Sequence, residues 1–229
     1  MDLIGTYEPL KLYKDDYFPA FSDLGALRHL EIDGLYELAS FGIGVSSLES
    51  FVLRWVHEDI SSLSGFTNLH TLKLVGETNR RLLGSREPVQ QTTLSLPRLK
   101  SLYMQWLIRG IQDVQFNTPK LECLDILCRY SQLRGKANYA KVQTEHVSWR
   151  VENDWKAIDT NKKITFELQS ILLAYPDTSY FTFPSIFKEM VVELLQEPII
   201  DSPLSAALRA VTFEGPSGDR ETLMVEELW

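Results

Sequence analysis

The stretch FTNLHTLKLV, residues 66–75, carries leucines at positions 69, 72 and 74 of the chain. Four other stretches have nearly the same text: LGALRHLEID (24–33), VSSLESFVLR (45–54), LPRLKSLYMQ (96–105) and TPKLECLDIL (118–127). They share the pattern Leu-x-x-Leu-x-Leu, with weaker copies starting at Tyr7 and Leu208. The first six copies begin at residues 7, 27, 48, 69, 99 and 121, at intervals of 20, 21, 21, 30 and 22. Four of these intervals lie in the range typical of leucine-rich repeats.

The spacing inside the pattern predicts strands. The fourth and sixth positions are two residues apart, so on an extended strand both side chains point to the same side. A helix fits poorly, because residue i+5 lies well off the stripe formed by residues i and i+3. One repeat cannot bury enough apolar surface alone, whereas stacked repeats share one interior. The sequence therefore predicts an α/β leucine-rich-repeat solenoid, with a curved parallel sheet on its concave side and short helices and loops on its convex side.

The regular repeats occupy residues 1–135, and residues 136–229 are expected to form irregular C-terminal repeats and a cap that continue the same solenoid. Between the strands, residues 34–42 and 57–66 are predicted to form short helix-like turns. The stretch LIRGIQDVQF (107–116) has apolar residues near helical spacing. The longer interval between residues 74 and 96 is expected to be an insertion on the return side, as a tolerated surface loop or a partner-binding loop.

The second half has a weaker pattern. Alternating apolar residues predict strands at Val147–Val151, Ile164–Leu168 and Phe181–Phe183. Helical spacing is found in ELQSILLAY (167–175) and PSIFKEMVVELLQE (184–197). One interpretation is degenerate repeats that begin at Thr144, Asn161 and Thr178. The competing interpretation is a hairpin that pairs residues 147–151 with residues 164–168.

The phrases LPRLKSL (96–102) and TPKLECL (118–124) resemble the leucine-rich-repeat region of fungal F-box proteins, especially those of mushroom-forming fungi. The resemblance covers residues 7–130 well and residues 200–214 loosely. It implies that the chain is similar to the substrate-recognition half of a ubiquitin-ligase receptor, in which an F-box docks on the ligase and the repeats hold the substrate. Residues 1–20 do not contain the three-helix F-box text. Ligase components are therefore expected as partners only if an F-box precedes the repeats, and the alternative is a stand-alone or truncated repeat scaffold.

Composition excludes several classes of function. The chain has 23 Lys and Arg against 31 Asp and Glu, a formal net charge of −8, and shows none of the basic stripes that nucleic-acid binding requires. No apolar run approaches the length of a membrane span. The first residues lack the features of a signal peptide, and two cysteines cannot form a disulfide framework. These features predict an intracellular protein, cytoplasmic or nuclear.

The sequence offers no catalytic, metal-binding or cofactor-binding residues. Its four histidines form neither His-x-x-x-His nor His-Glu-x-x-His, and Cys123 and Cys128 lack the Cys-x-x-Cys spacing. Glycine-rich phosphate loops and the Gly-x-Ser-x-Gly nucleophile motif are also missing. Cys123 is expected to be a free surface thiol with no histidine beside it. We therefore expect no enzyme, and the alternative is an enzyme with a site in the irregular second half.

The outward positions of the strands form columns that are candidates for protein binding. Lys11 should lie beside Glu31, and Asp33 beside Arg54, as solvated pairs or as part of a recognition surface. Trp, Tyr and Arg most often carry binding energy at interfaces. We expect a protein partner on this face, with neither nucleic acid nor membrane as a ligand. Trp55 and Trp106 could instead fill the core at the strand-to-return corner. The candidate partner-binding residues are Glu31, Asp33, Arg54, Trp55, Lys73, Tyr103, Gln105, Trp106 and Asp125.

Overall fold

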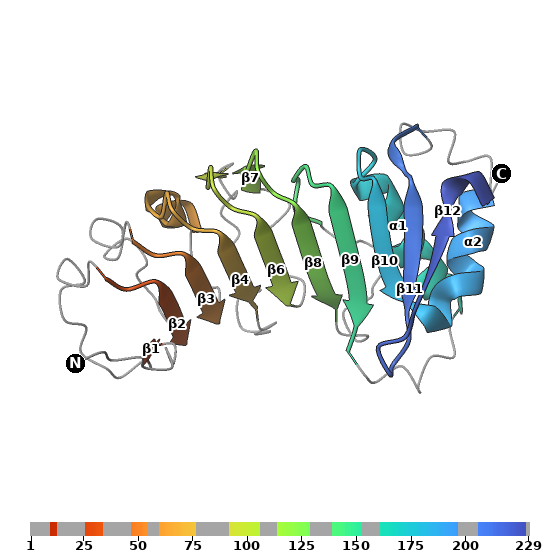
Figure 1. The fold of residues 1–229 in the computed structure, drawn as a ribbon, viewed down its shortest axis with the longest axis horizontal. Helices are drawn as coiled ribbons and strands as arrows, with labels where there is room; N and C mark the ends of the chain where they lie inside the picture. The colour runs from red at the N-terminus through yellow and green to blue at the C-terminus, as the bar shows by residue number, and fades with distance from the viewer. Residues whose placement is uncertain are drawn as a thin grey trace, which may run out of the picture.

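A ten-stranded, mostly parallel β-sheet runs through the part of the chain that the computed structural model describes (Figure 1). That part comprises residues 10–12, 26–33, 47–54, 60–76, 92–105, 114–128, 139–152, 161–196 and 206–227. In spatial order the strands are β1 (Leu10–Leu12), β2 (His29–Asp33), β3 (Ser50–Arg54), β4 (Thr71–Val75), β6 (Ser101–Gln105), β8 (Cys123–Cys128), β9 (His146–Val151), β10 (Tyr180–Pro184), β11 (Ala210–Glu214) and β12 (Arg220–Met224). Among these described strands, only the β11–β12 pair is antiparallel, and β1 and β12 lie at the two ends of the strand order.

The repeat leucines align across the strands as the sequence predicts. The fourth positions of the five regular copies pair directly in one row, and this row continues into the second half. Its members are Leu30, Phe51, Leu72, Leu102, Leu124, Val147, Phe181 and Val211. Each of them is at most 1% exposed. The prediction of a mixed α/β fold with a parallel sheet is therefore confirmed, and β8 and β9 pair directly across the boundary predicted at residue 135.

The buried face of the sheet packs against a layer of return segments. This layer contains short 3-10 helices, a second parallel pair of strands and two α-helices, with both α-helices at the β9–β12 end in Figure 1. Its elements are η3 (Ile60–Gly65), β5 (Thr92–Ser95), β7 (Val114–Asn117), α1 (Asn161–Ala174), η8 (Ser185–Phe187) and α2 (Lys188–Gln196). A last 3-10 helix, η10 (Val225–Glu227), follows β12. Trp149 on β9 contacts the rings of Phe183 and Phe187, which joins the sheet to the helical end of this layer.

Several local predictions are wrong, including the strand expected at residues 164–168. Helical spacing in residues 107–116 gives way to strand β7 from Val114, because Val114 and Phe116 alternate inward and pair with β5. Residues 164–168 belong to helix α1, so neither the proposed hairpin nor a repeat beginning at Asn161 exists. The apolar side chains of Ile164, Leu168 and Leu172 form the buried stripe of that helix, at a spacing of four residues.

Other local predictions are confirmed where the structure describes them. Strands β9 and β10 follow Thr144 and Thr178, the starts of two predicted degenerate repeats. Helices α1 and α2 contain most of the two stretches with helical spacing. The turn predicted at residues 57–66 includes the 3-10 helix η3. The turn at 34–42 lies outside the described residues, as does most of the insertion between strands β4 and β6.

A small polar cluster is buried behind β8 and β9. Glu167 of α1 is fully buried and accepts a hydrogen bond from the hydroxyl of Tyr139 at 3.1 Å. The Tyr175 ring lies edge-on to that of Tyr139, and its buried hydroxyl has no hydrogen-bond partner among the described residues. Burial raises the pKa of the nearby Cys128 thiol to about 12. Burial also raises the pKa of Tyr139 and Tyr175, so these two hydroxyls and the Cys128 thiol are kept uncharged at neutral pH.

Candidate functional site

The face of the sheet opposite the leucine row carries three columns of outward side chains. Because side chains alternate along each strand, these columns hold the residues on either side of the buried positions. We call them the open face. It consists of Ser50, Thr71, Ser101, Cys123, His146 and Tyr180 in the first column; Glu31, Val52, Lys73, Tyr103, Asp125, Ser148, Thr182, Thr212 and Thr222 in the second; and Arg54, Val75, Gln105, Leu127, Arg150, Glu214 and Arg220 in the third.

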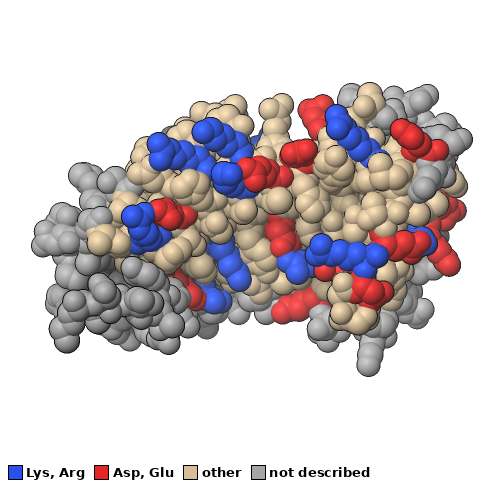
Figure 2. Space-filling view, in the orientation of Figure 1, with Lys and Arg blue, Asp and Glu red and all other residues tan. Residues whose placement is uncertain are grey.

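Figure 1 shows the open face toward the viewer, with α1 behind the strands, and Figure 2 shows both signs of charge interspersed over it. Six of the nine predicted partner-binding residues have described side chains on this face: Glu31, Arg54, Lys73, Tyr103, Gln105 and Asp125. The backbone of Asp33 lies in β2, with Arg54 as its neighbour on β3. The predicted residues Trp55 and Trp106 lie outside the described residues.

The N-terminal part of the face is held by an ion pair that crosses strands diagonally. Nε of Arg54 donates to Oε1 of Glu31 at 2.7 Å, although the direct strand neighbour of Arg54 is Asp33. The backbone neighbours predicted for Glu31 and Arg54 are thus confirmed by the register, with Lys11 opposite Glu31. This pair fixes two of the candidate residues to each other.

At the centre of the face a cation lies on an aromatic ring. The ammonium of Lys73 lies 4.4 Å from the ring centroid of Tyr103 on the next strand, within the range of a cation–π contact. Burial raises the pKa of the Tyr103 hydroxyl, and the charge of Asp125 raises it further, while Arg150 acts in the opposite direction. Tyr103 is therefore a neutral hydroxyl at neutral pH, available as a hydrogen-bond donor.

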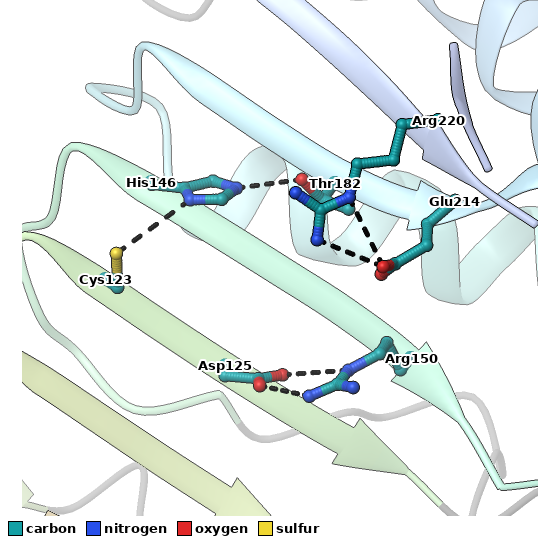
Figure 3. A network of polar contacts seen from close by, with 7 residues as sticks. All are labelled: Cys123, Asp125, His146, Arg150, Thr182, Glu214 and Arg220. Atoms are coloured by element: carbon teal, nitrogen blue, oxygen red, sulfur yellow. Dashed lines mark hydrogen bonds and ion pairs between the residues drawn. The ribbon is translucent and has the colours of Figure 1, made fainter. Parts of the chain in front are cut away.

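A polar network occupies the face from β8 to β12 (Figure 3). Arg150 donates from two guanidinium nitrogens to the two carboxylate oxygens of Asp125, and its Nε lies 3.2 Å from Oδ1. Burial acts to lower the pKa of Arg150, but the hydrogen bond and charge of Asp125 raise it on balance. Farther along, Arg220 donates to Glu214 at 3.1 Å. Both arginines are therefore held in place by acids of neighbouring strands.

The same network contains a thiol–imidazole–hydroxyl chain. Sγ of Cys123 lies 4.0 Å from Nδ1 of His146, and Nε2 of His146 lies 2.9 Å from Oγ1 of Thr182. The expectation that no histidine lies beside Cys123 is wrong, because the register places His146 opposite it on β9. The predicted exposure of the Cys123 thiol is confirmed.

The electrostatics of this chain oppose nucleophilic catalysis. Burial raises the pKa of the Cys123 thiol, and the charges of Glu122, Asp125 and Glu145 raise it further. Burial also lowers the pKa of His146. An active cysteine needs the reverse, a thiolate stabilised by an imidazolium. At neutral pH the pair is therefore a thiol beside a neutral imidazole.

Sequence reasoning missed the residues of the face beyond β8, namely His146, Arg150, Thr182, Glu214 and Arg220. The signal that could have found His146 is the repeat that begins at Thr144. Once Val147 is aligned with Leu124, His146 falls beside Cys123 and Arg150 falls beside Leu127. Asp125, which the sequence did single out, thereby gains Arg150 as its partner.

A groove lies away from the open face. Its volume is about 900 Å³, it is formed where β7, residues 141–144 and the end of α1 meet, and Gln115 and Lys141 form a parallel bridge along it. Lys141 and Asp177 are its charged lining residues. Within the described part of the chain, no three His, Cys, Asp or Glu side chains lie close enough together to hold a metal ion.

None of the helices in the described ranges has the length and apolarity needed to cross a lipid bilayer. Comparison with protein-family models, with curated proteins and with solved structures gives no match to this chain.

Proposed function

We propose that this chain is a leucine-rich-repeat solenoid that binds a protein partner on the open face of its sheet and carries out no reaction itself. In this view the sheet is the concave side of the solenoid, and the 3-10 helices, β5, β7, α1 and α2 form its convex side. The repeat pattern and the continuous leucine row support this assignment.

The observation that carries the proposal is the contrast between the two sides of each strand. Inward residues such as Leu72 and Leu124 are 0% exposed and repeat with little variation. Their outward neighbours differ in size, polarity and charge from strand to strand, and Lys73 and Asp125 are examples of this variety. A face built of fixed strands and varied side chains is suited to the recognition of another macromolecule.

Resemblance to fungal F-box proteins supports a more specific role, the holding of a substrate for ubiquitin transfer. That role requires an F-box, and the scaffold role requires none. A catalytic role has weaker support, because the pKa directions of Cys123 and His146 oppose a reactive thiolate. We therefore assign the chain to protein binding, in an intracellular compartment.

Cys123 provides a direct test, because it is exposed on the open face while Cys128 is buried. A 5-kDa polyethylene glycol attached to Cys123 through a maleimide should block a partner on that face. The matched control carries Cys123→Ser with Asp177→Cys, which places the polymer at the groove lining. Proteins captured from extracts of the source cells are compared by quantitative mass spectrometry.

We expect a set of captured proteins that is lost when the polymer is on residue 123 and kept when it is on residue 177. Tyr103→Ala and Arg54→Ala should weaken the same capture without unfolding the chain. Capture that survives the polymer on residue 123 would contradict the proposal, as would the absence of any protein sensitive to its position.

A further inference from the structure

The open face differs in charge from the rest of the molecule. Among its described side chains the acids are Glu31, Asp125 and Glu214, and the bases are Arg54, Lys73, Arg150 and Arg220. Four bases less three acids give +1, while the whole chain has a formal charge of −8. The face therefore presents a local excess of positive charge on an acidic protein.

That excess is located at one side chain. Each arginine of the face is bonded to an acid of the face: Arg54 to Glu31, Arg150 to Asp125 and Arg220 to Glu214. Lys73 differs, since among the described residues its one close polar or aromatic contact is the Tyr103 ring. The cation at the centre of the face thus has an aromatic platform, and no acid of the described part of the chain is paired with it.

Half-buried side chains flank this cation on the two neighbouring strands. Val52 and Tyr103 are the direct strand neighbours of Lys73, and both are half-buried. An ammonium in partly apolar surroundings loses some of its hydration, which strengthens its attraction to an incoming anion.

We infer that Lys73 and Tyr103 receive an aspartate or glutamate side chain from an acidic segment of the protein partner, with an adjoining apolar side chain packed on Val52. This inference rests on the proposed function and specifies its partner. The carboxylate pairs with the ammonium of Lys73 and can accept a hydrogen bond from the Tyr103 hydroxyl. A nucleic acid is disfavoured as the ligand, because its binding needs a stripe of several Lys or Arg side chains that are not paired with acids.

A random 12-residue peptide library displayed on phage tests the inference. Selections are run on the wild-type chain, on Lys73→Glu, and on the matched control Lys141→Glu, whose exposed lysine lines the groove instead of the open face. The wild type and the control should enrich Asp or Glu next to an aliphatic or aromatic residue. Lys73→Glu should instead enrich Lys or Arg at that position.

One selected peptide is then synthesised for binding measurements. Lys73→Glu, or replacement of the peptide's acid by its amide, should weaken binding about tenfold or more. Lys141→Glu should leave the affinity unchanged. Circular dichroism and thermal unfolding of each variant show whether the fold is retained, and Lys73→Met gives a charge-neutral version of the test.

The possible outcomes separate this inference from the proposed function. If the enriched peptides lack acids, or if Lys73→Glu selects the same peptides as the wild type, the inference is overturned. The proposed function still stands in that case if polymer on Cys123 displaces those peptides. Peptides that bind equally well with the polymer in place overturn both proposals, and a selection that enriches no peptide counts against the inference.

Discussion

Cys123 on β8 and His146 on β9 are direct neighbours, with 4.0 Å between the sulfur and Nδ1 of the imidazole. Such a pair is the starting geometry of many reactive cysteines, yet burial and acidic neighbours raise the pKa of this thiol while burial lowers that of the histidine. The pair therefore provides a test of whether geometry or electrostatics decides reactivity.

We predict slow alkylation of Cys123. At about pH 7.4, iodoacetamide should react with it more slowly than with N-acetylcysteine, and the rate should rise at higher pH as the thiolate forms. His146→Ala should not slow the reaction further, because the neutral imidazole does not activate the thiol. Mass spectrometry of timed samples measures the rate, with denatured protein as the control in which Cys128 also reacts. Fast alkylation that His146→Ala abolishes would revive the enzyme alternative.

The leucine row should dominate stability. Leu102→Ala removes a side chain that is 1% exposed and lies between Leu72 and Leu124 of the neighbouring strands. We therefore expect a loss of about 2–5 kcal/mol in the free energy of unfolding. Ser101→Ala, one residue away on the open face, should change it by less than about 0.5 kcal/mol. Urea unfolding followed by circular dichroism gives both values. Equal effects of the two substitutions would show that the two faces are misassigned.

Two buried tyrosines should respond oppositely to loss of their hydroxyls. Tyr139→Phe removes the hydrogen bond to the buried Glu167 and should lower the free energy of unfolding by about 1 kcal/mol or more. Tyr175→Phe removes a buried hydroxyl that has no partner among the described residues, so it should leave stability unchanged or raise it by about 1 kcal/mol. A large loss for Tyr175→Phe in urea unfolding would reveal a hydrogen bond to that hydroxyl.

The same cluster predicts a loss of stability in alkali. Burial raises the pKa of Tyr139 and Tyr175 above their usual 10.0 and raises that of Cys128 from 9.0 to about 12. Above about pH 9 the unfolded chain releases protons that the native protein keeps, so the free energy of unfolding falls as the pH rises. Urea unfolding at about pH 7, 8.5 and 10.5 measures the decline, which should be smaller in Tyr175→Phe. A flat profile would contradict the burial of these groups.

The ion pair between Asp125 and Arg150 should contribute little to stability. Their side chains are 27% and 44% exposed, so water screens the attraction. A double-mutant cycle with Asp125→Ala and Arg150→Ala should give a coupling of about 0.2–1 kcal/mol that shrinks in high salt. Thermal or urea unfolding of the four proteins measures it. A coupling of several kcal/mol would show that the pair is shielded from solvent.

Much of the sheet could be predicted from the sequence because each regular repeat specifies its own register. Leu72 and Leu102 pair as expected despite the 30-residue interval between the first positions of their repeats, since an insertion on the return side leaves the strand pattern intact. The return segments were less predictable. Val114 and Phe116 fit both a short strand and part of a helical stripe, and only pairing with β5 decides between them.

The strand wrongly predicted within α1 has a similar cause, because the same apolar residues fit both the helical spacing and the strand alternation. Ile164 and Leu168 fit the stripe of a helix, but with Phe166 they also fit an alternating strand, and Phe166 proves to be exposed at 46%. The prediction of the candidate site from the sequence was limited in the same way. The part of the open face built from regular repeats, such as Tyr103 and Asp125, could be assigned, whereas Arg150 depended on a strand whose register the sequence left open.

The groove between β7 and the end of α1 lies where the return segments behind the sheet change from a strand to a helix. Neighbouring strands such as β5 and β7 lie about 4.8 Å apart, whereas helices packed side by side need about 8–10 Å. Repeat units whose return segment is a strand therefore pack behind the sheet at a different spacing from units whose return segment is a helix. The sheet strands of both kinds of unit keep the same spacing. The boundary between these two kinds of repeat unit is the natural position at which to add, delete or exchange units in an engineered version of this protein.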